Sequence, residues 1–286
     1  MRAKFITATI GLLSGFGVGT VVLAEQEDYQ FEPIAFSEST ALKRGAYSPS
    51  YDGGSYLSDK DACHLAVSTW GWENASCAVV DKIFLMPTPA MDTVIIEKPN
   101  SDGYVTFDDW ANKDRDKQIG EIWSQLESGL KSQSEKLGVP ITADKWFVYP
   151  TLNADKQYLY YATKINWNGE PTINVKASKF DRQGYVVFDM VPLDSEMTAE
   201  ALETNVEEAL AMYKPNATMA YSEFSEGDKI AAAGAVGVLA TLVGVKFGKA
   251  AAVGAFALIL AFAKKLWILI FIPLIALKNK IFKKKD

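Results

Sequence analysis

The carboxyl-terminal stretch from Gly227 to Asp286 constrains this chain more than any other feature. Its long apolar runs are punctuated by lysines, and no acidic residue lies between Asp228 and Asp286. This composition suits a bilayer and its cytoplasmic surface better than the core of a water-soluble domain. We therefore predict a membrane anchor over residues 229–277 and a basic cytoplasmic tail over residues 278–286.

The predicted anchor divides into three apolar runs, residues 230–245, 250–263 and 266–277. Each run is shorter than the roughly 20 residues that a perpendicular transmembrane helix needs, so tilt, snorkelling lysines or an interfacial location must make up the difference. We predict that the first run crosses the membrane and that the later runs lie in or re-enter the cytoplasmic leaflet. Glycines in the first run could pack on a partner helix, and plain anchoring is an equal alternative. The residues assigned to the anchor are Ile230, Val245, Lys246, Lys249, Lys264, Lys265 and Trp267.

The amino terminus has the pattern of a secretory signal peptide. Arg2 and Lys4 precede an apolar run over residues 5–23, which closes at Ala24. We predict cleavage after Ala24. An uncleaved anchor is the alternative, because the run is about long enough to span a bilayer. In either case the chain from residue 25 onward starts outside the cytoplasm.

The predicted exported part, residues 25–228, is strongly acidic. It holds 17 basic and 34 acidic residues, a net charge of −17, whereas residues 229–286 carry +9. Such a domain is not attracted to nucleic acid, while the positive tail favours an anionic cytoplasmic leaflet. The charge asymmetry therefore predicts membrane topology, with the lipid bilayer as a partner and nucleic acid excluded.

Two cysteines, Cys63 and Cys77, lie 14 positions apart in a segment predicted to be in an oxidising compartment. We predict a disulfide between them, worth on the order of 3 kcal/mol through restriction of the unfolded chain. Two buried free thiols are the alternative. The only histidine, His64, has no second histidine beside it, so we predict no metal site there.

Residues 58–113 begin with a short helix starting near Ser58 and continue into strands. β-Branched runs over residues 78–86 and 92–97 predict two strands joined by a proline-rich loop. An acidic-aromatic cluster, Asp108-Asp109-Trp110, follows; it lacks the spacing of a calcium loop, and cap or turn roles are favoured for its carboxylates.

Residues 114–228 predict a helix, a sheet and a second helix. Apolar residues recur at helical spacing over residues 119–137 and stop at Gly138, which is typical of a long amphipathic helix. A second amphipathic helix is predicted over residues 197–213. Between the helices lie four strand-like runs, residues 146–149, 157–167, 172–180 and 185–191, with Asn168-Gly169 as a hairpin signal.

These elements predict an α+β fold, an antiparallel β-meander with helices covering one face of the sheet. We divide the exported part into residues 25–113 and 114–228. The sequence leaves open whether these are two lobes or one continuous sheet. Strand pairing between Val94 and the later meander would decide the question.

Several short motifs follow one another in a set order. They are Gly103-Tyr104-Val105, Asp108-Asp109, residues 146–150, Asp155, Leu159-Tyr160, Asn174, Arg182, Gly184 and the Gly227-Asp228-Lys229-Ile230 start of the apolar stretch. In this order they resemble the bacterial membrane-anchored proteins grouped as domain of unknown function 2167, over most of residues 58–286. The resemblance implies a signal peptide, an exported domain and a lysine-bounded anchor, and it supplies no reaction.

The chain departs from this family pattern in its third strand. Residues 174–180 read Asn-Val-Lys-Ala-Ser-Lys-Phe in place of an arginine- and asparagine-rich strand. For this reason no role is carried over from the family to the polar groups of that strand.

We hypothesise a non-enzymatic binding or scaffolding module of the bacterial envelope, held at the inner membrane with its main domain in the periplasm and its carboxyl terminus in the cytoplasm. The partner would be another envelope or membrane protein. No catalytic residue, metal ligand or cofactor is assigned, because no phosphate loop or nucleophile motif is present. The alternatives are a carboxylate-based hydrolase, with Asp108, Asp109, Asp114 and Asp116 as weak candidates, and a protein that acts on membranes through its tail.

Overall fold

The computed structural model describes residues 29–36, 39–49, 51–69 and 74–245. The predicted signal peptide and the anchor residues Lys246, Lys249, Lys264, Lys265 and Trp267 lie outside the described residues. Among the described residues, no helix has both the length and the apolar character needed to cross a bilayer.

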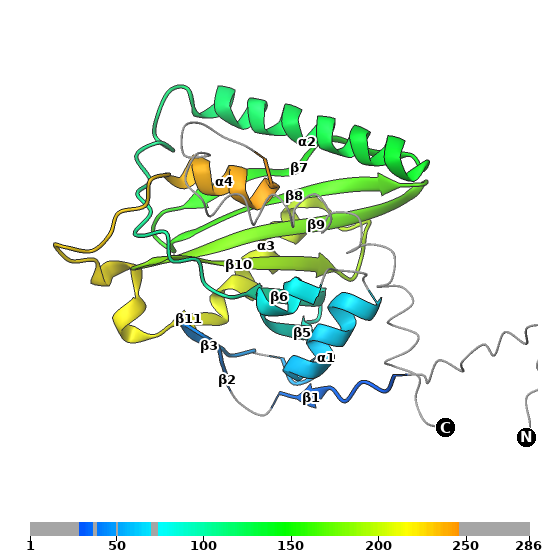
Figure 1. Cartoon of the computed structure of the whole chain (residues 1–286), viewed down its shortest axis with the longest axis horizontal. Helices are drawn as coiled ribbons and strands as arrows, with labels where there is room; N and C mark the ends of the chain where they lie inside the picture. Colours follow the sequence, from blue (N-terminus) through cyan, green and yellow to red (C-terminus); the bar gives the residue numbers. More distant parts are fainter. Residues whose placement is uncertain (1–28, 37–38, 50, 70–73, 246–286) are drawn as a thin grey trace, which may run out of the picture. The chain divides into compact units, whose positions relative to one another are not determined.

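An eight-stranded antiparallel sheet forms the centre of the fold (Figure 1). Its strands, in spatial order, are β1 (Ile34–Ala35), β4 (Ser55–Tyr56), β5 (Val80–Thr88), β6 (Met91–Glu97), β10 (Gly184–Pro192), β9 (Glu170–Asp181), β8 (Tyr158–Trp167) and β7 (Ile141–Asn153). The predicted meander is confirmed as β7 to β10. Asn168 and Gly169 adopt φ values of 52° and 92°, the conformation that a two-residue hairpin turn requires.

One continuous sheet joins the two predicted halves of the domain, whose boundary in the sequence was placed after residue 113. Strand β10 pairs with β6, and Met190 lies opposite Val94. The question that the sequence left open is therefore answered by a pairing between residues almost 100 positions apart. A smaller sheet contains β2 (Thr40–Ala41), β3 (Gly45–Tyr47) and β11 (Tyr213–Pro215).

The predicted helices are present, and their ends follow the capping signals. Ser58 and Thr198 accept backbone N–H groups at the starts of their helices, and Gly138 ends α2 in the left-handed conformation. The helices are α1 (Asp59–His64), α2 (Arg115–Leu137), α3 (Ala199–Ala211) and α4 (Ala235–Val243). Shorter helical turns are η1 (Leu65–Thr69), η2 (Asn74–Ala78), η3 (Ala217–Met219) and η4 (Tyr221–Glu223).

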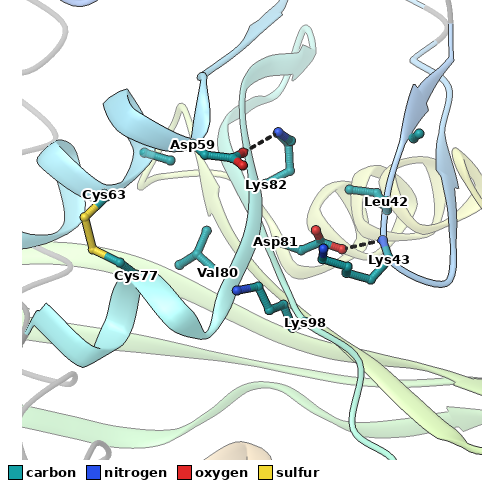
Figure 2. Close-up of a pocket in the computed structure, with 11 residues that line it drawn as sticks. Leu42, Lys43, Asp59, Cys63, Cys77, Val80, Asp81, Lys82 and Lys98 are labelled. Carbon is teal, nitrogen blue, oxygen red and sulfur yellow. Dashed lines mark hydrogen bonds and ion pairs between the residues drawn. A yellow bond between two sulfur atoms is a disulfide. The ribbon is translucent and has the colours of Figure 1, made fainter.

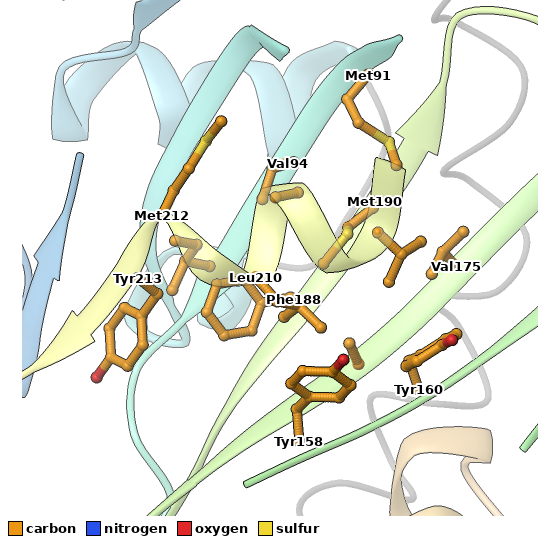
Figure 3. Packing of buried hydrophobic residues seen from close by; sticks show 14 of the residues in the cluster. Met91, Val94, Tyr158, Tyr160, Val175, Phe188, Met190, Leu210, Met212 and Tyr213 are labelled. Atoms are coloured by element: carbon orange, nitrogen blue, oxygen red, sulfur yellow. The ribbon is translucent and has the colours of Figure 1, made fainter. Parts of the chain in front are cut away.

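Helices cover both faces of the sheet, which corrects the prediction of one covered face. In β8, Tyr158 and Tyr160 pack with α3, whereas Leu159 and Tyr161 pack with α2 and α4. Figure 3 shows the first of these clusters, in which Leu210 of α3 lies next to Phe188 of β10 and Met190 belongs to the same cluster. Side chains alternate between faces along a strand, so the near-continuous apolar run of β8 reflects burial on both sides.

Residues 230–245 correct a second prediction, because this segment is folded into the domain. Ile230 forms a bridge with Tyr104, and the nine-residue helix α4 lies on the sheet beside α2. Figure 1 shows α4 in front of β8 and β9. Leu239 and Val236 are fully buried in the core shared with α2. The apolar character that suggested a transmembrane crossing is thus used to fill a protein core.

Candidate functional site

The predicted disulfide is confirmed. Cys63 and Cys77 are bonded, with an S–S distance of 2.00 Å and a Cα–Cα distance of 4.9 Å. The bond joins the end of α1 to η2. The neighbouring His64 ring lies edge-on to Phe31 at a centroid distance of 5.7 Å. His64 is therefore part of an aromatic contact on this side of the domain.

The two acidic candidates have different environments. Asp108 is exposed. The Oδ2 atom of Asp109 accepts the backbone N–H of Val236 at 3.0 Å, at the start of α4. Burial raises the pKa of Asp109, and backbone N–H groups of Val236, Ala235 and Gly237 oppose the rise. Asp109 thus caps α4 from a distant loop, which matches the cap role favoured from sequence.

The other two candidate carboxylates also have local roles. Asp114 occupies the residue before α2, and Asp116 pairs with Arg115 at 2.9 Å. Asp116 also accepts a hydrogen bond from the Tyr149 hydroxyl at 3.1 Å. These contacts lie around the first turn of α2 and do not direct Asp116 toward Asp109.

A backbone contact joins the 103–109 loop to the segment that leads into α4. The Tyr104 N–H donates to the Lys229 carbonyl at 2.8 Å, and the Ala231 N–H donates to the Tyr104 carbonyl at 2.9 Å. Gly103 has φ = 118°, and a Cβ there would lie 2.7 Å from the Lys229 carbonyl oxygen. Only glycine combines this conformation with so close an approach.

An ion pair holds the same segment from the β9–β10 turn. Arg182 donates to both carboxylate oxygens of Asp228, at 2.7 and 2.9 Å. Bidentate pairs of this kind fix geometry as well as adding energy. The hydrogen bond from Arg182 holds the pKa of Asp228 below its usual value. The Ser225 N–H donates to the same carboxylate at 2.8 Å.

Aromatic rings complete this contact. The Tyr104 ring lies 4.3 Å from that of Tyr221 and 4.2 Å from that of Phe224, and Phe107 stacks parallel to Tyr221 at 5.2 Å. The Tyr221 hydroxyl donates to the Val105 carbonyl at 2.7 Å. We call residues 103–109, Arg182 and residues 221–236 together the docking seam.

The docking seam brings together motif residues that are far apart in sequence. Gly103, Tyr104, Asp109, Arg182 and the Asp228-Lys229-Ile230 start of the apolar stretch all meet there. Gly184 belongs to the adjoining turn, where a Cβ would lie 2.5 Å from the Asn100 carbonyl oxygen. Sequence reasoning identified these residues as a set but did not predict that they touch.

Sequence reasoning missed a row of charged side chains across the sheet. Lys176 of β9 lies opposite Asp189 of β10 and forms an ion pair with it, and Glu97 of β6 hydrogen-bonds to Asp189. Burial and the charge of Asp189 raise the pKa of Glu97 to about 7. Burial alone would lower the pKa of Lys176, but Asp189 and Glu97 together raise it. The signal in the sequence was a charge at an inward position in each of three strongly apolar strands.

Polar atoms without partners flank this charged row. Asn174 and Ser178 lie two residues on either side of Lys176, and Thr163 is paired with Asn174 across β8 and β9. Asn174 Oδ1, Ser178 Oγ and Thr163 Oγ1 are buried with no hydrogen-bond partner among the described residues. Buried groups of this kind in native proteins usually contact ordered water. The third strand therefore places three side chains that can form hydrogen bonds, Asn174, Lys176 and Ser178, at alternate positions of one buried face.

Glu97→Gln is expected to remove a pH-dependent loss of stability. Ionised Glu97 disfavours folding, so the wild-type free energy of unfolding should fall as pH rises from the unfolded pKa of 4.5 to the folded pKa of about 7. A glutamine can still donate to Asp189. Relative to wild type, the variant should gain about 2–3 kcal/mol between pH 5 and pH 8, measured by denaturant unfolding. Exposed Glu135→Gln on α2 is the control, and parallel pH curves for the Glu97 variant and wild type would contradict the expectation.

No group of three or more potential metal-ligating side chains is found within the residues that the structure describes. The charged row contains two carboxylates and a lysine, and the ammonium group of Lys176 pairs with Asp189.

Comparison with known proteins gives one positive result. A family model described as "Protein of unknown function (DUF2167)" matches residues 50–275. No curated protein and no solved structure matches the chain. The matched range covers strands β4 to β11, helices α1 to α4 and the docking seam, and β1, β2 and β3 precede it. The chain therefore belongs to the DUF2167 family.

Proposed function

We propose that this protein is a membrane-anchored module of the bacterial cell envelope, whose folded domain lies outside the cytoplasm and binds or scaffolds another envelope component. The export pattern of residues 1–24, the opposite charges of the domain and the tail, and the family membership support this proposal. The anchor in this proposal begins after residue 245, in the runs 250–263 and 266–277.

The docking seam is the observation that carries the proposal. A domain tethered through a flexible linker can rotate freely, and its orientation at the membrane is undefined. Here residues 228–245 are held by a bidentate ion pair, a backbone bridge and a buried helix. The chain that continues past residue 245 therefore leaves the domain from a fixed position. A fixed exit point restricts the orientations that the domain can adopt. Less orientational freedom is then lost when the domain binds a partner, so binding costs less free energy.

The docking seam also weakens the hydrolase alternative. A pair of catalytic carboxylates needs two different environments and access to a substrate. The Asp109 carboxylate is engaged by backbone N–H groups at α4, and Asp116 is engaged by Arg115 and Tyr149. Asp109 accepts a hydrogen bond from the start of α4, and this structural role is enough to explain why the Asp108-Asp109 motif contains it. No catalytic role for Asp109 is needed.

The proposal predicts a partner that depends on the folded domain. We expect chemical cross-linking of the full-length protein in its native membrane, followed by purification and mass spectrometry, to recover a specific envelope protein. The matched control keeps residues 1–24 and 246–286 and lacks residues 25–245, because α4 belongs to the domain. A protein recovered with both forms, or lipid alone with the full-length form, would contradict the scaffold proposal.

A further inference from the structure

A cavity of about 460 Å³ opens between the β2–β3 hairpin, α1 and β5 (Figure 2). Its volume lies in the range of small-molecule sites. We call it the lysine pocket. The lining residues are Ala41, Leu42, Lys43, Asp59, Ala62, Cys63, Cys77, Val80, Asp81, Lys82 and Lys98.

The disulfide fixes one wall of the lysine pocket. It joins α1 to η2, and the last residue of η2, Ala78, accepts a hydrogen bond from Lys98 Nζ at 2.6 Å. The Lys98 N–H also donates to the Val79 carbonyl at 2.7 Å. The ammonium group of Lys98 is thereby held at the pocket wall before any ligand arrives.

The charges of the lysine pocket are positive in balance. Lys82 pairs with Asp59 at 2.8 Å, but the Asp59 side chain is 88% exposed, so this pair contributes little and can open. Asp81 accepts the backbone N–H of Lys43 at 2.8 Å. In the described part of the chain, no carboxylate forms an ion pair with the ammonium group of Lys43 or Lys98.

All three lysines line the same pocket as Asp59, and their charges favour its ionised form. The pKa of Asp59 is lowered by the hydrogen bond and charge of Lys82, and further by the charges of Lys43 and Lys98. The lysine pocket therefore holds three lysines against two carboxylates, Asp59 and Asp81, a net charge of +1. Residues 25–228 as a whole carry a net charge of −17. A general excess of basic residues therefore does not explain why three lysines line one pocket.

We propose that the lysine pocket binds a small anion of the phosphoryl class, with Lys43, Lys82 and Lys98 as its ligands. The oxygens of the anion would replace the Asp59 carboxylate as the partner of Lys82 and would also contact the ammonium groups of Lys43 and Lys98. The apolar wall formed by Leu42, Val80 and the disulfide would contact the group that carries the phosphoryl. The same chemistry fits free phosphate and the phosphoryl headgroup of a larger envelope molecule.

The test is calorimetric titration of the full-length protein in neutral detergent at low ionic strength. Sodium phosphate and glycerol phosphate are the two probes, because the second mimics an esterified headgroup. Lys43→Gln/Lys98→Gln should weaken binding at least about tenfold, since two charged contacts are lost. Asp59→Asn should strengthen binding about threefold, because a competing negative charge is removed. Lys117→Gln/Lys131→Gln, which removes the same charge from the exposed face of α2, should leave binding unchanged.

Binding of both probes with this pattern supports a site for the phosphoryl group itself, and binding of glycerol phosphate alone supports a site for its esters. The proposal is overturned if neither probe binds, or if the two double variants have equal effects. Thermal unfolding of each variant shows that it is folded, so that a loss of binding is not a loss of structure.

Discussion

A chain that ends at Val245 is expected to fold, whereas a chain that ends at Asp228 is expected to remain unfolded. The shorter chain lacks α4, whose aliphatic side chains are almost completely buried: Val236, Val238, Leu239, Leu242 and Val243. At roughly 1.5–3 kcal/mol for each buried side chain, their loss removes on the order of 10 kcal/mol. That is comparable to the total stability of an ordinary domain, roughly 5–15 kcal/mol. The shorter chain also loses the hydrogen bond from the Tyr161 hydroxyl to the Leu242 carbonyl.

Circular dichroism and thermal unfolding of the two purified chains check this prediction. The chain ending at Val245 should show a cooperative transition and the near-ultraviolet signal of packed aromatic rings. The chain ending at Asp228 should show neither and should bind hydrophobic dyes. Two equally folded chains would mean that α4 is not an integral part of the core. Two unfolded chains would mean that the residues after 245 are needed for folding.

Arg44→Met is expected to destabilise the domain by about 3–5 kcal/mol, because it leaves a buried carboxylate unpaired. Arg44 Nη1 lies 3.0 Å from Asp181 Oδ1, and the Asp181 side chain is completely buried. Arg44 also contacts the Asn100 carbonyl, so it joins the β2–β3 turn both to the end of β9 and to the loop that follows β6. After the substitution Asp181 Oδ1 keeps the Gln183 N–H as a donor, at 2.8 Å.

The loss caused by Arg44→Met should depend on pH. Burial raises the pKa of Asp181, and Arg44 opposes that rise. Without Arg44 the folded-state pKa rises further, so the variant loses more stability at pH 7 than at pH 5, where the carboxyl group can be protonated. Denaturant unfolding at both values measures the difference. The double variant Arg44→Met/Asp181→Asn should recover most of the loss, and a double variant as unstable as Arg44→Met would show that packing, not charge, is responsible.

Local patterns were enough to predict much of the fold. The period of residues 119–137, the glycine that ends it and the strand-like runs after it correspond to α2 and the β7–β10 meander. The cysteine spacing in a segment predicted to be exported was enough to expect the disulfide. Each of these signals depends on residues that are neighbours in sequence, and therefore each could be recognised without knowing the partners.

Other features depended on partners that the sequence did not reveal. Val94 pairs with Met190, and this pairing converts two predicted halves into one sheet. Lys176 and Asp189 lie inside only because each is the other's partner across adjacent strands. A charge within an apolar strand indicates a buried partner, but neither strand alone identifies which residue that partner is, so the pairing could not be predicted.

The sequence by itself determined the order of the main elements from α1 to α3, the disulfide and the opposite charges of the domain and the tail. It also determined that residues 230–245 must leave water, since an apolar helix is unstable when exposed. Only the tertiary structure decided where they go: the face formed by α2, β8 and β9 offers these residues an apolar protein core. The docking seam holds them there, because Gly103, Asp109 and Arg182 come together only when the sheet has formed.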